Sequence, residues 1–95
     1  MRWLTHDDFA ALVGAPFTVG LPGGQPRTLV LSEAVLGRDE GGRGPHGETR
    51  RQFALVFDGP AGLPQGTWEA RHDELGELAL FLVPIGPGRY EAAFA

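Results

Sequence analysis

The sequence predicts a mainly β domain of about six antiparallel strands in a meander, which form a small barrel or a strongly curled sheet, with one short N-terminal helix. Two observations support this class. Apolar and polar residues alternate over several short runs, as in residues 67–72, which is typical of strands with one buried face. The 15 glycines and 8 prolines separate these runs at regular intervals and mark turns. We favour the barrel because closure removes exposed sheet edges.

The length of 95 residues predicts a single domain over residues 1–95. Eight basic and twelve acidic residues give a net charge of -4 and a pI near 5.2. An acidic chain argues against sequence-independent binding to nucleic acid or to anionic membranes. The chain contains no cysteine, so thiol chemistry, disulfides and thiolate metal sites are excluded.

The N-terminus lacks the apolar core of a signal peptide, and no apolar run approaches the roughly 20 residues of a membrane span. We therefore expect a cytoplasmic location. No cofactor is expected.

The chain begins with a predicted short helix that Thr5 caps and Gly14 closes. Its apolar side is expected to carry Phe9, Leu12 and Val13. A helix of about two turns is unstable alone, so it must pack against the sheet. We expect it to cover one face or one open end of the strands.

Two strands follow, at residues 17–21 and 27–36. Phe17 and Val19 share a face in the first strand. In the second strand Glu33 falls on the same face as Leu29, so the strand is expected to bend or bulge there, or to reach the sheet rim. A short helix over residues 32–36 is the alternative.

Residues 37–49 are the most polar and glycine-rich part of the chain, and we expect a mobile loop. The alternation returns in residues 51–58, where Phe53, Leu55 and Phe57 are predicted to point inward.

The last three strands, within residues 67–94, form a predicted meander. A three-residue loop at residues 74–76, with Gly76 in the left-handed conformation, pairs Trp68 with Leu82. A two-residue loop would turn charged residues into the core, where they would be unpaired. If the inward and outward alternation continues in phase through the next turn, at residues 85–88, Leu82 pairs with Tyr90.

The middle strand of this meander has a second apolar face, formed by Ala79, Phe81 and Val83. Either the helix covers this face or it is a protein interface. Arg50 and Arg51 add a local basic spot in an acidic chain that can contact an acidic partner. These five residues are the candidate interface.

The polar residues form no recognisable catalytic or metal-binding motif in the sequence. A metal site is not expected, because the spacing of the clustered candidates at one hairpin matches no defined metal site. Those candidates are His72, Asp73, Glu74 and Glu77. Ser32 is the only serine and lies within a predicted strand, without the sharp turn that exposes a nucleophile. His46 is expected in the loop. The chain is therefore predicted not to be an enzyme.

Both ends of the chain carry motifs that resemble a family of small, uncharacterised bacterial domains. The N-terminal pattern comprises Thr5, Phe9, Leu12 and Gly14. The C-terminal patterns are Leu-Pro-Gln-Gly at 63–66, His-x-x-Leu-Gly at 72–76, Leu-Phe-Leu-Val-Pro at 80–84 and Arg-Tyr-Glu-Ala-x-Phe at 89–94. The resemblance implies a shared fold, assigns no catalytic residue, and suggests small accessory proteins associated with phage-tail-like components.

The function expected from these observations is a non-enzymatic protein-interaction or structural accessory module, plausible in a phage-tail-like assembly. The partner would be another protein or a second copy of the chain. The alternative is a small-ligand-binding β-barrel. Its ligand mouth would be lined by Trp68, His72, Tyr90 and Phe94.

Overall fold

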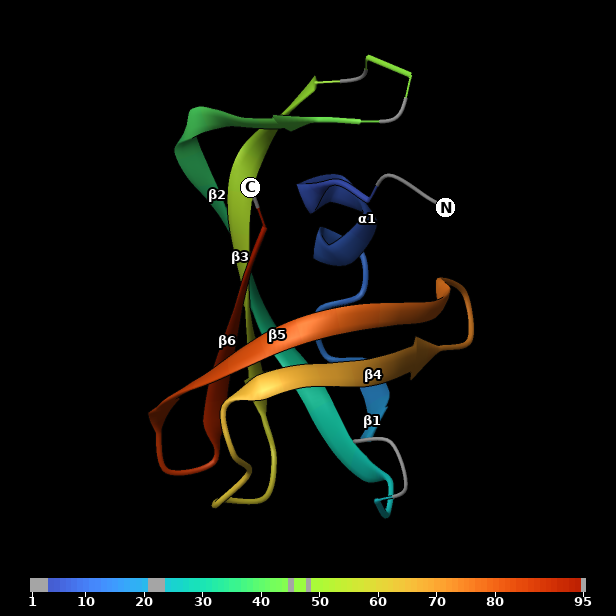
Figure 1. Cartoon of the computed structure of the whole chain (residues 1–95), viewed down its shortest axis with the longest axis vertical. Helices are drawn as coiled ribbons and strands as arrows, with labels where there is room; N and C mark the ends of the chain where they lie inside the picture. The colour runs from blue at the N-terminus through green and yellow to red at the C-terminus, as the bar shows by residue number, and fades with distance from the viewer. Residues whose placement is uncertain (1–3, 21–23, 45, 48, 95) are drawn as a thin grey trace.

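The computed structural model describes residues 4–20, 24–44, 46–47 and 49–94. Six antiparallel strands form a closed barrel in the order β1-β2-β3-β6-β5-β4, so the predicted fold class is confirmed (Figure 1). The elements are α1 (His6–Ala10), β1 (Pro16–Gly20), β2 (Arg27–Arg43), β3 (Thr49–Asp58), β4 (Gly66–His72), β5 (Gly76–Gly86) and β6 (Arg89–Phe94).

The barrel consists of two three-stranded meanders. Strands β1 to β3 are consecutive neighbours, as are β4 to β6. The two halves join where β3 pairs with β6, for example at Phe57 and Tyr90, and where β1 pairs with β4. The connection from β3 to β4, residues 59–65, therefore links strands that are not neighbours and crosses one end of the barrel (Figure 1).

Inward-pointing side chains fill the barrel. The alternation that predicted the strands places every second residue inside, and these residues have almost no exposed surface. With Phe9 from the helix, the largest fully buried side chains are Phe9, Phe17, Val19, Leu29, Leu31, Leu55, Phe57, Leu80, Leu82 and Tyr90. The interior is thus a packed core of large apolar residues.

The irregularity predicted near Glu33 is present as a β-bulge. Leu31 pairs with Phe57, whereas Glu33 pairs with the preceding residue of β3, Val56. The extra residue, Ser32, donates its hydroxyl hydrogen to the Val56 carbonyl at 3.0 Å. The bulge shifts the parity of β2, so that Glu33 points outward and the following Ala34 packs against the core.

The predicted loop at residues 37–49 is shorter than expected. Strand β2 continues to Arg43 and β3 begins at Thr49, so the two strands form a long ribbon that extends beyond the barrel (Figure 1). The pairing is irregular between Leu36 and Arg43. At Gly37 a Cβ atom would lie 2.9 Å from the Gln52 carbonyl oxygen, so this glycine allows the strands to approach closely.

The hairpin between β4 and β5 has the predicted parity but a different register. Trp68 pairs with Leu80 rather than Leu82, and His72 pairs with Gly76. Gly76 has the expected positive φ of 73°. A shift of two residues leaves every side chain on its predicted face.

The turn between β5 and β6 is tighter than expected. Pro84, not Leu82, pairs with Tyr90, again a shift of two residues. Gly86 pairs with Arg89, and Gly88 in the turn adopts a φ of 69°.

Helix α1 closes the end of the barrel from which the β2–β3 ribbon extends (Figure 1). The Thr5 amide donates to Asp8 Oδ2 at 2.8 Å, which satisfies a free N–H at the start of the helix. The helix packs against β2 and β3 and buries Phe9, and Leu12 is buried in the turn that follows. Val13 is 50% exposed, contrary to prediction, because the helix ends at Ala10.

Candidate interaction surface

The outer face of β5 is uncovered. Phe81 is 52% exposed and Ile85 is 49% exposed, while Ala79 is exposed and Val83 is half-buried. Helix α1 lies over the end of the barrel against β2 and β3, so the expectation that it covers this face is wrong. An interface remains as the second of the two predicted explanations.

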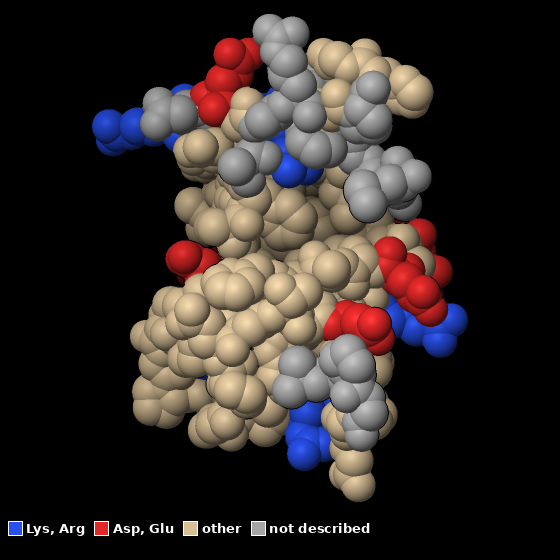
Figure 2. Space-filling model, in the orientation of Figure 1, with Lys and Arg blue, Asp and Glu red and all other residues tan. Residues whose placement is uncertain are grey.

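The exposed face of β5 continues into a larger surface made by residues 59–67 and 81–88, which we call the uncharged surface. Neither segment contains Asp, Glu, Lys, Arg or His. The segments are adjacent, because Thr67 pairs with Phe81 and the Gly59 amide donates to the Gly88 carbonyl at 2.9 Å. Figure 2 shows a broad area without charged side chains over this end of the barrel.

Two buried aromatic residues attach the 59–65 connection to the barrel. The Tyr90 hydroxyl donates to the Pro60 carbonyl at 2.7 Å and accepts from the Leu63 amide at 3.0 Å. Trp68 Nε1 donates to the Pro64 carbonyl at 3.1 Å. Both residues were predicted to line a ligand mouth, but their polar groups hold the backbone of the uncharged surface in place.

The other two predicted mouth residues lie at the helix end of the barrel. The His72 ring lies 4.8 Å from the Phe17 ring, and its Nδ1 accepts from the Glu74 amide at 3.0 Å. The Phe94 ring stacks on Phe53 at 4.6 Å. Trp68 borders a hollow of about 260 Å³ and Phe94 a separate one of about 380 Å³. The four residues therefore do not converge on one cavity.

Arg50 and Arg51 have different environments. Arg50 donates to the Leu4 carbonyl, and its guanidinium lies 5.3 Å from the Phe53 ring centre and 5.6 Å from that of Phe94. Burial lowers the pKa of this guanidinium. Arg51 is exposed and donates to the Gly37 carbonyl. Arg50 thus ties the segment before α1 to β3, and its participation in an interface stays a prediction.

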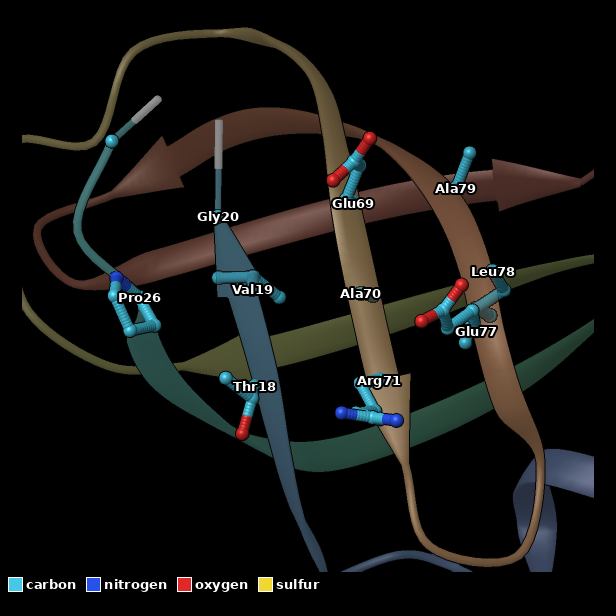
Figure 3. Close-up of a pocket in the computed structure, with 11 residues that line it drawn as sticks. Thr18, Val19, Gly20, Pro26, Glu69, Ala70, Arg71, Glu77, Leu78 and Ala79 are labelled. Atoms are coloured by element: carbon cyan, nitrogen blue, oxygen red, sulfur yellow. The ribbon is translucent and has the colours of Figure 1, made fainter. Parts of the chain in front are cut away.

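A groove of about 570 Å³ crosses the outer faces of β1, β4 and β5 (Figure 3). Its charged lining residues are Glu69, Arg71 and Glu77. Among the described residues, no ion pair within 4 Å joins Arg71 to either carboxylate, whereas Arg89 Nε lies 3.3 Å from Asp58 Oδ1.

The described residues include no group of three or more His, Asp or Glu side chains placed to hold a metal ion. Over the same residues, no helix has the length and apolar character needed to cross a membrane.

A comparison with known protein families identifies the family to which the chain belongs. A family model described as a domain of unknown function (DUF6916) matches residues 4–94, so the chain belongs to this family. Neither a curated protein nor a solved structure matches it. The predicted kinship with small domains of unknown function is therefore confirmed.

No role was predicted for the connection at residues 59–65. The signal that identifies it as part of a surface was present, since two segments close to the same predicted hairpins both lack charged residues. What the sequence did not provide was their contact, which depends on the β3–β6 pairing and the position of Tyr90.

Proposed function

We propose that this domain is a non-enzymatic protein-interaction module that docks on another protein, or on a second copy of itself, through the uncharged surface. The observation that carries the proposal is the exposure of Phe81 and Ile85 in an area without charge, on a barrel whose interior is already filled. Such apolar areas on a folded domain are typical of interaction sites.

The size of the uncharged surface suits a contact at the lower end of the range for stable complexes. Nine residues of 59–67 and seven of 81–88 are exposed or partly exposed. A standard interface uses about 20–30 residues on each side. The partner must therefore cover nearly all of the surface and also contact its rim.

Prolines restrict the backbone of the uncharged surface at four positions, because proline fixes its own φ angle and lacks an N–H group. The prolines are Pro60, Pro64, Pro84 and Pro87. These residues lose little backbone entropy when the surface is covered. This favours docking of a folded partner through side-chain contacts.

The alternative, a barrel that binds a small ligand, lacks a supporting observation. Trp68, His72, Tyr90 and Phe94 are engaged in contacts within the protein. The family resemblance suggests a phage-tail-like assembly as the setting.

Light scattering across a concentration series, with Phe81→Glu compared with the unchanged protein, tests the proposal. Val35→Glu is a matched control, because Val35 is 51% exposed on the outer face of β2, away from the uncharged surface. A self-associating protein is expected to become monomeric with Phe81→Glu only.

If the unchanged protein is monomeric, the same three proteins are compared for the native partners that they retain. Loss of a partner with Phe81→Glu, but not with Val35→Glu, is the expected result. Identical masses and identical partners for all three proteins would contradict the proposal.

A further inference from the structure

The groove on β1, β4 and β5 lies directly beside the uncharged surface. Thr67 pairs with Phe81 within that surface, the next outward pair is Glu69 with Ala79, and the one after is Arg71 with Glu77. The outer face of the β4–β5 hairpin therefore changes from uncharged to charged within two residue pairs. A protein that covers Phe81 also reaches the groove.

We propose that the partner presents a lysine or arginine next to its apolar contact residues, and that this basic side chain lies in the groove between Glu69 and Glu77. The inference rests on the proposed function, because it describes the partner of the same surface. It adds a basic side chain as the feature that distinguishes the partner from other proteins with an apolar surface.

The shape and lining of the groove suit a long side chain with an aliphatic stem. The apolar residues Pro26 and Ala79 line it, and Val19, Ala70 and Leu78, whose side chains pack toward the core, lie beneath it. Lysine and arginine bury their methylene groups along apolar surface and keep the charged group at the polar rim. The volume of about 570 Å³ leaves space for one such side chain.

The charges of the groove favour a cation. Glu69, Arg71 and Glu77 are all exposed, and together they leave one negative charge in excess. In Figure 3 Glu69 and Arg71 lie toward opposite ends of the labelled part of β4, and Glu77 lies between them in the view, on β5. Diagonal neighbours on adjacent strands lie about 7–8 Å apart, so a cation between Glu69 and Glu77 interacts with both carboxylates. Arg71 is positively charged and weakens this attraction. Removing its charge should therefore strengthen the binding of a basic side chain.

The spacing on the partner follows from the strand geometry. Phe81 and Ala79 lie two residues apart on β5, which is roughly 7 Å along the strand. The basic residue and the main apolar residue of the partner must therefore lie on the same face at a similar spacing. Residues two apart on a strand, or three to four apart on a helix, meet this condition.

A random library of 12-residue peptides, selected on the immobilised full chain, supplies the probe. Selected peptides are expected to combine an aromatic or aliphatic residue with Lys or Arg. Exposed ion pairs contribute little each, so Glu69→Gln should weaken binding of the best peptide about threefold, and Glu69→Gln combined with Glu77→Gln about tenfold. Arg71→Gln should strengthen binding about threefold.

Glu33→Gln is the control, because Glu33 is an exposed carboxylate on β2 outside both the groove and the uncharged surface. It should leave the dissociation constant unchanged. If only the net charge of the domain mattered, Glu33→Gln and Glu69→Gln would raise the dissociation constant by the same factor.

The outcomes separate this inference from the proposed function. Peptides that lose binding with Phe81→Glu, but carry no excess of basic residues or do not respond to Glu69→Gln and Arg71→Gln, would overturn the groove assignment and leave the docking surface standing. Peptides that bind equally well to Phe81→Glu, or a selection that yields no binder, would overturn both.

Discussion

The phenylalanine rings at the two ends of the barrel point in opposite directions. At the α1 end the aromatic rings point inward and pack together, with Phe9 fully buried among them. At the 59–67 end apolar side chains such as Phe81 and Ile85 point outward. Because the interior is already filled, the outward apolar residues are not needed for the core. Their position is the basis for the proposed contact with another protein.

The ends also differ in what holds them together. Contacts between aromatic rings hold α1 in place, because the centre of the Phe9 ring lies 5.7 Å from that of Phe53 and 5.5 Å from that of Phe94. Hydrogen bonds fasten the 59–65 connection through Tyr90 and Trp68. Substitutions at the helix end should therefore cost mainly stability, whereas substitutions on the uncharged surface should cost mainly binding.

The largest effect on stability is expected from Phe9→Ala, which removes a fully buried ring from the helix end. Loss of a buried phenylalanine typically lowers the free energy of unfolding by about 3–5 kcal/mol. Val13→Ala, at a half-exposed position just after the same helix, should change it by less than about 0.5 kcal/mol. Urea denaturation of both variants measures the difference. Equal losses would show that α1 is not packed as described.

The next effect concerns the turn that joins the uncharged surface to β6. Gly88 has a φ of 69°, and a Cβ atom there would lie 2.7 Å from the Gly59 carbonyl oxygen. Gly88→Ala should lower the free energy of unfolding by about 2 kcal/mol or more, from both backbone strain and collision.

Gly76→Ala is the matched control for this turn, because Gly76 has a φ of 73° with no atom close to the added Cβ. It should cost only about 1 kcal/mol, from strain alone. If thermal denaturation gave equal costs for the two variants, the contact between residues 59 and 88 would be refuted.

Tyr90→Phe removes the hydroxyl that binds both Pro60 and Leu63. The ring stays in the core, so the expected loss is about 1–2 kcal/mol from the unpaired backbone groups. Hydrogen exchange gives a local readout, since the Leu63 amide should exchange faster while amides of β2 stay unchanged. An unaltered exchange rate at Leu63 would contradict the proposed role of Tyr90.

The smallest effect is expected from Arg50→Lys, which keeps the charge but loses the planar group near Phe53 and Phe94. The loss should be about 0.5–1 kcal/mol. Burial lowers the pKa of Arg50, so the folded state disfavours its charged form slightly, yet an arginine remains charged around neutral pH. The loss should therefore not vary with pH there. Arg51→Lys, at an exposed position, is the control.

The sequence predicted the strands, their faces and the bulge near Glu33, because side-chain alternation has a period of two and breaks visibly where a residue is inserted. It missed the register of both late hairpins by two residues. Parity alone decides which face is buried, so pairs shifted by two are equally compatible with the pattern.

The sequence also gave a wrong account of residues 37–49. Glycine and charge are typical of loops, but here they occur in a ribbon whose pairing is irregular. Charged residues on exposed strand edges also discourage pairing with other chains, which the composition alone does not distinguish from a loop. For the candidate site, Phe81 was predicted correctly as an apolar outward residue, whereas its joining to residues 59–67 needed the three-dimensional structure.

Site-specific photo-crosslinking in the cells that produce the protein tests the docking surface most directly. A photoreactive residue replaces Ile85 on the uncharged surface or, as a control, Val35 on β2, which is equally exposed. Irradiation should yield a discrete crosslinked species from position 85, either a dimer or a complex with another protein, and none from position 35. Equal crosslinking at both positions, or none at position 85, would contradict the assignment of the uncharged surface as an interface.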